Sequence, residues 1–304
     1  MPPMMPRRHT SWKRPRPAGR FPPPGPPGGR ASDTRLGCCR CLPIASRTKP
    51  TRRNVRNRLP HRRPWLQSTV GCPSLGFLSA EHVGGVAVVV GVTVALTVVA
   101  RKYPGRWITL VSRVLAVLIA AAEPSYWIGQ AIHGVYSPRD DLPLHLSRAA
   151  EFVSAAALWW PKPFLVELTY FWGLGAIVQA LATPDIQQHF PDPGYFRFYV
   201  GHGGVLVAAV FLVLGRGIWP RPGAPVRVFL ATIVFTAIAG LADILTGGNY
   251  MFLREKPTAG SLLNFLGPWP WYIASGLLLA IVFLAVLNAP FWFARLRAVV
   301  PSAR

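Results

Sequence analysis

Two histidines and several charged side chains stand out because they interrupt long apolar runs. His145, Arg148 and Glu151 follow one another at three-residue spacing, with Ser147 among them, and His202 lies in a later run between glycines. A neutral imidazole can take a proton near physiological pH, and a serine hydroxyl or a water can be the nucleophile that it activates. These residue types predict acyl transfer or hydrolysis, with His145, His202 and Ser147 as candidate catalytic residues.

A second set of polar residues accompanies these three and suits substrate binding. The set comprises Glu123, Trp127, Arg148, Asp243, Asn249, Tyr250 and Arg254. Arg148 or Asn249 could stabilise the oxyanion that develops during acyl transfer. Ser147 is only two residues from His145 and lies on a different helix face, so His202 is the better candidate for its base.

The same residues also allow interpretations without catalysis. Arg148 and Glu151 could form an ion pair within one helix, while the histidines could serve packing alone. The cluster could instead bind a small polar or lipidic solute in a transporter or binding protein. Transport would require polar residues in both leaflets, whereas Glu167 is the main polar group expected in the other leaflet and is predicted to have a structural partner.

A metal site is a further alternative, because histidines and carboxylates can bind zinc or iron. The residues that could form it are His145, His202, Glu123 and Asp243. No HxxxH or similar ligand spacing occurs around them. We therefore expect no metal and no other cofactor.

The elements that must position these residues are seven apolar runs. The chain is 51% hydrophobic and only 14% charged, and its apolar residues are concentrated in blocks long enough to cross a bilayer as helices. The runs cover residues 82 to 100, 107 to 128, 142 to 160, 164 to 182, 195 to 215, 226 to 246 and 270 to 293. The predicted fold class is all-α: a polytopic membrane protein with a bundle of about seven transmembrane helices.

The direction of these spans predicts that the polar residues meet at one side of the bilayer. Odd spans start, and even spans end, on the same face. Glu123 and Asp243 come near the ends of even spans, and His145 and His202 near the starts of odd spans. The stretch GGNYMFLREKPTAGS then follows span six as a polar loop, which we expect to form a wall or lid over a shared pocket.

The first 75 residues differ in composition from the rest of the chain. Residues 1 to 78 hold 17 of the 33 Lys and Arg, one of the 11 acidic residues and all four cysteines. Such a Pro- and Arg-rich segment cannot bury enough apolar surface to fold, so we expect residues 1–75 to be a disordered tail or a mis-assigned start. Residues 76–298 form the predicted membrane domain, and residues 299–304 a short C-terminal tail.

Partners and location follow from the same patterns. Membrane lipids are the expected partners; no nucleic acid is expected, because the basic tail lacks interleaved aromatic residues and a recognisable binding fold, and no protein partner is indicated. Of the basic residues that flank the spans, most lie on the side of the membrane that holds Arg101, Lys162 and Arg295. The positive-inside rule then predicts a multi-pass protein of the plasma membrane, with the N-terminus outside and the C-terminus cytoplasmic.

Several stretches together resemble a known family. They are FLSAEHVGG before span one, DLPLHLSRAAEF at span three, YVGHGG in span five, and GGNYMFLREKP followed by GSLLNFLGPWPWY. Over residues 76 to 295 the chain resembles the bacterial YwaF family of multi-pass integral membrane proteins.

This resemblance extends to a eukaryotic branch implicated in transferring fatty acyl groups between phospholipids. In that branch a cysteine precedes a histidine at the start of a span. Here His145 matches the histidine, while Leu144 occupies the cysteine position, and no cysteine follows Cys72. The resemblance implies lipid acyl chemistry, but an acyl-enzyme on a thiol cannot form in this membrane domain.

Overall fold

The fold is helical throughout the residues that can be described. A computed structural model describes residues 78–182, 184, 186, 188–257 and 262–299, and contains no strand within these ranges. All of them belong to one compact unit, Asn57–Arg304. The tail predicted at residues 1–75, with its four cysteines, lies outside the described residues, as does most of the tail predicted at residues 299–304.

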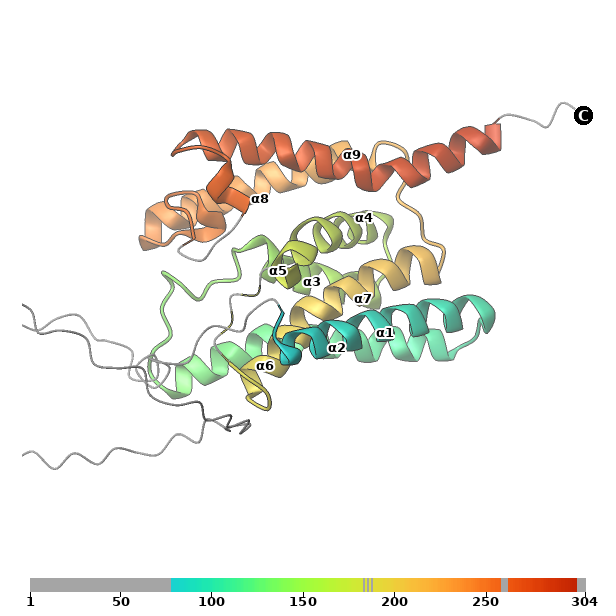
Figure 1. The fold of residues 1–304 in the computed structure, drawn as a ribbon, viewed down its shortest axis with the longest axis horizontal. Coiled ribbons are helices and arrows are strands. Elements are labelled where there is room, and N and C mark those ends of the chain that lie inside the picture. Colours follow the sequence, from blue (N-terminus) through green and yellow to red (C-terminus); the bar gives the residue numbers. More distant parts are fainter. Residues whose placement is uncertain (1–77, 183, 185, 187, 258–261, 300–304) are drawn as a thin grey trace, which may run out of the picture. The chain divides into compact units, whose positions relative to one another are not determined.

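Six helical segments are long and apolar enough to cross a membrane. They are α1 (Ala80–Lys102), α2 (Trp107–Ile132), the run α4 (Pro163–Trp172), η2 (Gly173–Ile177) and α5 (Val178–Ala182), the run α6 (Pro193–Phe198), η3 (Tyr199–Gly203), α7 (Gly204–Val210) and η4 (Phe211–Gly215), α8 (Ala224–Thr246), and α9 (Trp271–Val299). Figure 1 shows these helices running roughly alongside one another. The prediction of an all-α, multi-pass membrane protein is confirmed.

The third predicted span is shorter than expected. Its helix, α3, covers Leu146–Trp159, only 14 residues, which span about 21 Å at 1.5 Å per residue against a hydrocarbon core about 30 Å thick. Prolines limit it at both ends, because Pro143 lies just before the helix and Pro161 follows Trp160. His145 therefore precedes the helix and its side chain stands at the first turn.

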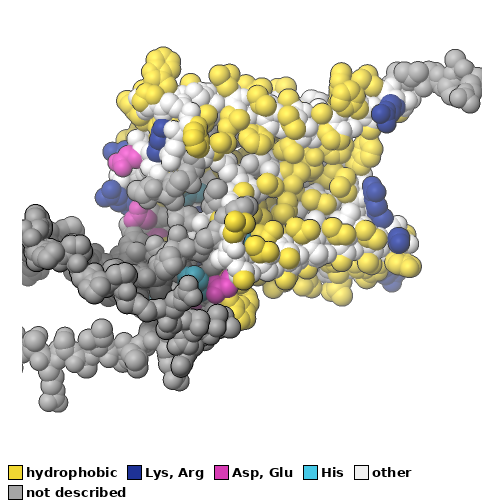
Figure 2. All heavy atoms as spheres, in the orientation of Figure 1, with side chains coloured by type: hydrophobic (Ala, Val, Ile, Leu, Met, Phe, Trp, Pro, Cys, Tyr) yellow, Lys and Arg dark blue, Asp and Glu magenta, His cyan; other side chains and the backbone are white. Residues whose placement is uncertain are grey.

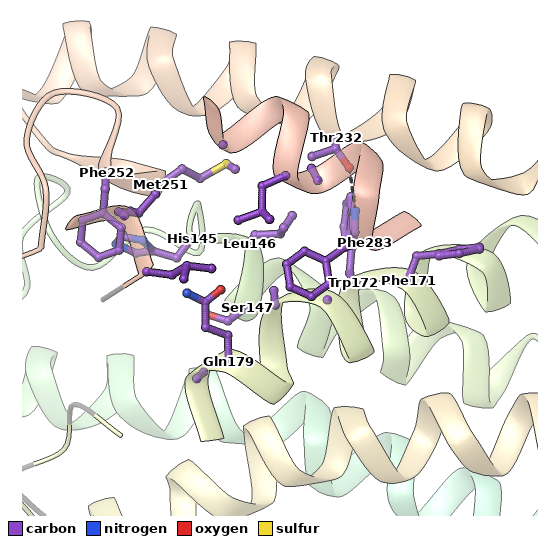
Figure 3. Close-up of a pocket in the computed structure, with 18 of the residues that line it drawn as sticks. His145, Leu146, Ser147, Phe171, Trp172, Gln179, Thr232, Met251, Phe252 and Phe283 are labelled. Atoms are coloured by element: carbon purple, nitrogen blue, oxygen red, sulfur yellow. Dashed lines mark hydrogen bonds between the residues drawn. The ribbon is translucent and has the colours of Figure 1, made fainter. Parts of the chain in front are cut away.

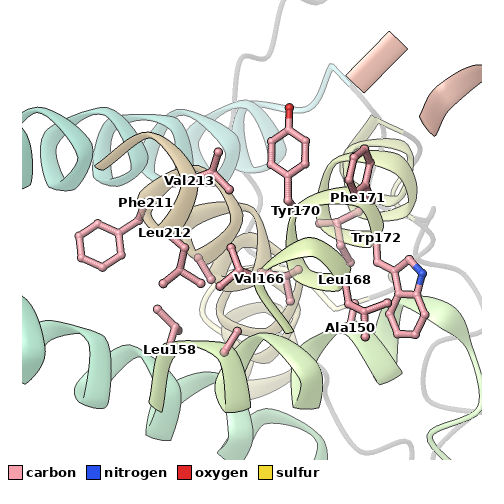
Figure 4. Close-up of a cluster of buried hydrophobic side chains, with 14 of the residues drawn as sticks. Ala150, Leu158, Val166, Leu168, Tyr170, Phe171, Trp172, Phe211, Leu212 and Val213 are labelled. Carbon is pink, nitrogen blue, oxygen red and sulfur yellow. The ribbon is translucent and has the colours of Figure 1, made fainter. Parts of the chain in front are cut away.

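The core lies around α7 and η4, which contact α1, α4 and, through α7, also α2 and α3. Buried side chains from α3, α4 and η4 interlock there, among them Leu158, Val166, Phe211 and Leu212 (Figure 4). Helices α8 and α9 pack on each other and reach this core through α4 and η2. Dispersion contacts dominate in such a core, since apolar helices gain no hydrophobic free energy from meeting inside lipid.

The outer helix faces are apolar. Helices α1, α8 and α9 expose many large hydrophobic side chains, such as Val88, Ile244 and Val286, and Figure 2 shows hydrophobic atoms covering much of the visible side of the helices. Faces of this kind suit lipid rather than water. Two short 3₁₀ turns, η5 (Tyr250–Phe252) and η6 (Leu262–Phe265), lie in the segment between α8 and α9.

Candidate functional site

A polar cluster connects the end of α2, the first turns of α3 and the start of η3. We define it as Glu123, Tyr126, Arg148, Glu151, Arg197 and His202. Arg148 Nε lies 3.4 Å from Glu123 Oε1, and His202 Nδ1 lies 3.4 Å from Glu151 Oε1. Both carboxylates are buried. Ionisable groups of α2, α3 and the run from α6 to η3 thus meet at one end of the helices.

These contacts run between helices and not along α3. A pair between Arg148 and Glu151 was one expected alternative, yet Arg148 turns to α2 and Glu151 to η3. Gly201 makes the second contact possible, because a Cβ at that position would overlap the Glu151 carboxylate. The glycine therefore lets η3 approach α3 closely.

Arginines also flank Tyr126. The guanidinium carbon of Arg148 lies 5.2 Å from the centre of the Tyr126 ring, and that of Arg197 lies 4.6 Å from it. Both distances are within the range of cation–π attraction. The sequence prediction missed Arg197, although its place at the start of the fifth span could have indicated it by the same argument from helix direction.

Hydrogen-bonding capacity in the cluster is incompletely used. Glu123 Oε2, Glu151 Oε2, Arg148 Nη1 and His202 Nδ1 are buried without a hydrogen-bond partner among the described residues. Buried polar atoms are nearly always satisfied by protein, water or ligand. These atoms can therefore still form hydrogen bonds with water or with the polar part of a ligand.

Asp141 organises the adjoining loop and was not predicted. Its fully buried carboxylate accepts hydrogen bonds from Tyr126 Oη at 2.8 Å and from the backbone N–H of Ser137 at 2.8 Å. The Trp127 indole N–H donates to the Asp141 carbonyl at 2.9 Å. Trp127, expected to bind substrate, uses its polar atom in this loop. An acidic pair before a span resembles an ordinary surface turn, so the sequence carried little signal for Asp141.

The segment after α8 is built around Asp243 and Tyr250. Asp243 Oδ1 accepts from the backbone N–H of Tyr250 at 2.6 Å. The Tyr250 hydroxyl donates to the Pro138 carbonyl at 2.6 Å and accepts from the Leu142 N–H at 3.0 Å. Burial raises the pKa of Tyr250, so the hydroxyl stays protonated and able to donate. Tyr250 thereby connects this segment to the loop before α3.

Asn249 and Arg254 bond within the same segment. The Asn249 side-chain oxygen accepts from the backbone N–H groups of Arg254 at 3.0 Å and Glu255 at 3.1 Å. Arg254 Nη1 donates to the Gly248 carbonyl at 3.3 Å. These contacts shape the loop, so its predicted role as a structured wall has a physical basis, and the binding roles of its side chains stay predictions.

Beside this loop lies an apolar cavity of about 390 Å³ (Figure 3). Its walls come from the start of α3, from α4 to α5, from α8 and α9, and from the two 3₁₀ turns. The lining residues are His145, Leu146, Ser147, Phe171, Trp172, Gly175, Ala176, Gln179, Ala180, Phe229, Thr232, Met251, Phe252, Pro257, Leu262, Leu263, Leu266, Gly276, Leu279, Ala280, Phe283 and Leu284.

Met251 and Phe252 line this cavity and have an uncommon backbone conformation. Their φ angles are 52° and 57°, in the left-handed region that side chains other than glycine seldom adopt. Such a conformation costs about 1 kcal/mol or more per residue and must be held by its surroundings. Here the Tyr272 hydroxyl donates to the Phe252 carbonyl at 2.5 Å. The result is that both side chains line the cavity next to His145.

His145 lines the cavity beside two aromatic rings. Its ring centre lies 5.5 Å from that of Tyr250 and 5.3 Å from that of Phe252. Burial, with a smaller contribution from the nearby positive charge of Arg148, lowers the pKa of His145 to about 4. Neither ring nitrogen has a hydrogen-bond partner among the described residues. His145 is thus a neutral imidazole whose nitrogens can serve a ligand.

The two predicted catalytic histidines occupy different surroundings. His202 is not part of the cavity lining; it contacts Glu151 and stacks on Phe198 at a ring separation of 4.8 Å. Ser147 lines the cavity together with His145. Of the two histidines, His145 is therefore the one that shares the cavity lining with Ser147, and the catalytic roles of all three residues stay predictions. No group of three or more His, Cys, Asp and Glu within the described ranges could hold a metal ion.

Comparison with models of protein families shows which family this helical chain resembles. The model of the TMEM164 family matches residues 77–288. The chain belongs to the TMEM164 family. The match covers every candidate residue from Glu123 to Arg254, whereas the narrower resemblance to YwaF proteins stays a prediction. No curated protein and no solved structure matches the chain.

Membership in the TMEM164 family agrees with the helical membrane architecture and does not assign a reaction. The matched range starts at the first described helix and ends within α9. Polar cluster and cavity both lie inside it. Their function must be argued from their chemistry.

Proposed function

We propose that this TMEM164-family protein is a membrane enzyme that transfers or hydrolyses an acyl group of a membrane lipid. One observation carries the proposal: an apolar cavity of about 390 Å³ has both His145 and Ser147 in its lining. The volume falls within the range of about 300 to 1,000 Å³ that is usual for small-molecule sites.

The cavity walls suit an acyl chain. Phe171, Trp172, Leu279 and Phe283 line it with apolar surface, and the Trp172 indole N–H is already bonded to Thr232 Oγ1 at 2.9 Å. An acyl chain in the cavity would therefore not leave the indole N–H of Trp172 without a hydrogen-bond partner. The adjoining polar cluster, with its unsatisfied carboxylate and guanidinium atoms, offers a place for the polar part of the lipid.

The chemistry would use His145 as general base. The neutral imidazole takes the proton of the Ser147 hydroxyl or of a water as the oxygen attacks the ester carbonyl. A new acyl–oxygen bond forms, the ester C–O bond breaks, and the proton passes from His145 to the departing alcohol. Arg148, close enough to depress the pKa of His145, would stabilise the oxyanion.

A second function, lipid binding without chemistry, is favoured by one specific observation. A base with a pKa of about 4 accepts protons poorly near pH 7, since general-base catalysis works best when the pKa is close to the working pH. A carrier or lipid-binding protein would need His145 only as a hydrogen-bond partner for the ester or a hydroxyl group.

Location and orientation belong to the same proposal. Helix length and composition support a multi-pass membrane protein. The excess of Lys and Arg at the ends opposite the polar cluster would lie in the cytoplasm, with the C-terminus, if the positive-inside rule applies. The plasma membrane is the proposed location, and the polar cluster would face the outer leaflet.

The test compares three variants in purified protein that has been reconstituted into phosphatidylcholine vesicles with labelled acyl chains. The enzyme model expects His145→Gln to lower acyl release or transfer by about a hundredfold or more while co-purified lipid is retained. His133→Gln, an exposed residue beyond α2, is the matched control and should match wild type.

Ala176→Phe addresses binding separately, because Ala176 lines the cavity and a phenyl ring would fill part of it. Both models expect this variant to lose co-purified lipid. Lipid loss without any product in wild type would support the binding protein and exclude the enzyme. Undiminished lipid in Ala176→Phe would exclude both.

A further inference from the structure

A second pocket lies at the opposite ends of the helices from the polar cluster. It has a volume of about 500 Å³ and forms where the turn between α1 and α2 meets the end of η4. Its lining residues are Ala100, Arg101, Pro104, Gly105, Ile108, Thr109, Leu214, Gly215, Arg216 and Gly217. Two arginines and a threonine thus line this space, and the lining contains no acidic residue.

Arg216 is the most unusual residue of this pocket. It is half-buried, and its side chain has no hydrogen bond or ion pair with any described residue. The backbone N–H of Arg216 donates to the Phe211 carbonyl at 2.8 Å, which holds the residue in place. Burial lowers its pKa. A partly buried guanidinium normally has a partner, because desolvation of an unpaired charge is costly.

Arg101 forms the opposite wall and is held by one contact. Its Nε–H donates to the Leu214 carbonyl at 2.7 Å. This bond connects the end of α1 to the end of η4 and uses only one of the five guanidinium N–H groups. The terminal amino groups of Arg101 remain available to a ligand across the pocket from Arg216.

No carboxylate among the described residues forms an ion pair with these arginines. Glu167 is the acidic residue that contacts the adjoining segment, and it already binds Arg221 at 2.9 Å and Arg227 at 2.8 Å. Arg295 from α9 donates to the Pro220 carbonyl of the same segment. Lys and Arg side chains accordingly gather at this end of the helices (right in Figure 2). The pocket therefore carries a net positive charge, and no acidic side chain among the described residues balances it.

We propose that Arg101 and Arg216 form a binding site for a phosphate group, supplied by the headgroup of an anionic membrane lipid. The planar guanidinium matches phosphate oxygens in a two-pronged geometry. The Thr109 hydroxyl adds a donor from the α2 side. Basic pockets between helix ends bind anionic headgroups in the negatively charged cytoplasmic leaflet. This site goes beyond the proposed function, since it lies away from the cavity and from His145.

The experiment uses the full chain in detergent micelles and measures bound phosphatidylglycerol by native mass spectrometry and by thermal stabilisation. The variant is Arg216→Gln. The matched control is Arg106→Gln, which removes the same charge from an exposed position at the same helix ends, outside the pocket lining. Folding is checked by helical content and elution volume.

We expect Arg216→Gln to weaken phosphatidylglycerol binding about tenfold, whereas Arg106→Gln should stay within about twofold. Stabilisation of wild type by inorganic phosphate, lost in Arg216→Gln, would identify free phosphate as a ligand of the same site. If Arg216→Gln does not fold, Arg101→Lys is used in its place. This substitution keeps the positive charge and removes the two-pronged geometry of the guanidinium. Equal effects of the pocket variant and of Arg106→Gln, or no effect of either, would overturn the proposal.

Discussion

Arg148 and Glu151 show how tertiary contacts override a local pairing. On a helix, residues three apart can pair and gain about 0.2 to 0.5 kcal/mol. In the structure Arg148 instead pairs with Glu123 of α2, and Glu151 pairs with His202 of η3. A buried carboxylate without an ion partner is far more costly than a lost helix-surface pair. The contacts across helices therefore give each of the two buried acids a partner, whereas the local pair would give a partner to only one.

His145 provides a prediction at this scale. Its pKa is about 4 in the folded protein and about 6.5 when solvated. As pH falls through 6.5 the unfolded chain takes up a proton that the folded protein does not, so the stability contributed by the neutral ring is present above pH 6.5 and is lost progressively down to pH 4. The loss should not exceed about 3.5 kcal/mol, since one pKa unit corresponds to about 1.4 kcal/mol.

The measurement is the thermal midpoint of wild type and His145→Gln in detergent at pH 7.5 and 4.5. Wild type should lose more stability than the variant over this interval, because glutamine does not titrate. A double variant that also carries His133→Gln serves as the reference for an exposed histidine. Equal pH dependence in wild type and His145→Gln would contradict the lowered pKa.

At the scale of elements, glycines decide how closely η3 and α7 approach their neighbours. A Cβ at Gly203 would meet Val89 of α1 at 2.5 Å, and one at Gly204 would meet Ile119 of α2 at 2.6 Å. Small residues at helix crossings allow backbones to come close inside a membrane. Gly203 and Gly204 thus let this helical run pack closely against α1 and α2, as Gly201 does against Glu151 of α3.

Gly201→Ala tests this packing. The added methyl group would overlap the Glu151 carboxylate, so we expect a loss of about 1 to 3 kcal/mol, as for other overpacked sites. Thermal unfolding in detergent measures it. Gly129→Ala is the matched control, because nothing lies within 4 Å of a Cβ there and it also sits in a membrane helix. Equal stability of the two variants would show that η3 has room to shift.

At the scale of the whole molecule, Glu167 connects distant parts of the chain. The fully buried Glu167 carboxylate of α4 binds Arg221 in the loop before α8 and Arg227 within α8. Arg295 of α9 donates to Pro220 in that loop. Helices α8 and α9 form two walls of the cavity. This ion network, remote from His145, therefore holds the helices that shape the cavity.

Glu167→Gln should destabilise the protein by about 1.5 to 3 kcal/mol, because the fully buried carboxylate accepts charge-assisted hydrogen bonds from Arg221 and Arg227 that a neutral amide replaces only in part. The same variant should reduce the lipid that co-purifies with the protein, since α8 and α9 would lose an attachment to α4. Thermal unfolding and lipid mass spectrometry measure the two effects. Glu255→Gln, an exposed acid in the loop after α8, is the control. An unchanged unfolding midpoint in Glu167→Gln would argue against the network as a structural connection.

Several features followed from the sequence alone. Apolar length predicted the membrane helices, because a bilayer requires about 20 apolar residues per crossing. Helix direction predicted that Glu123, His145, His202 and Asp243 belong to the same end, and the contacts among α2, α3, η3 and the Tyr250 segment agree with that placement. The polar stretch that begins at Gly247 was predicted to follow span six as a loop, and α8 ends there with Gly247 in the left-handed conformation.

Only the tertiary structure decided which of these groups meet. Hydropathy predicts how deep a residue lies in the membrane, but not which way its side chain points around the helix axis. That direction depends on how the helix packs against its neighbours. The separation of His202 from the cavity of His145 and the burial of Asp141 both arise in this way. Long apolar stretches are determined locally, whereas a site is determined by contacts between residues far apart in the chain.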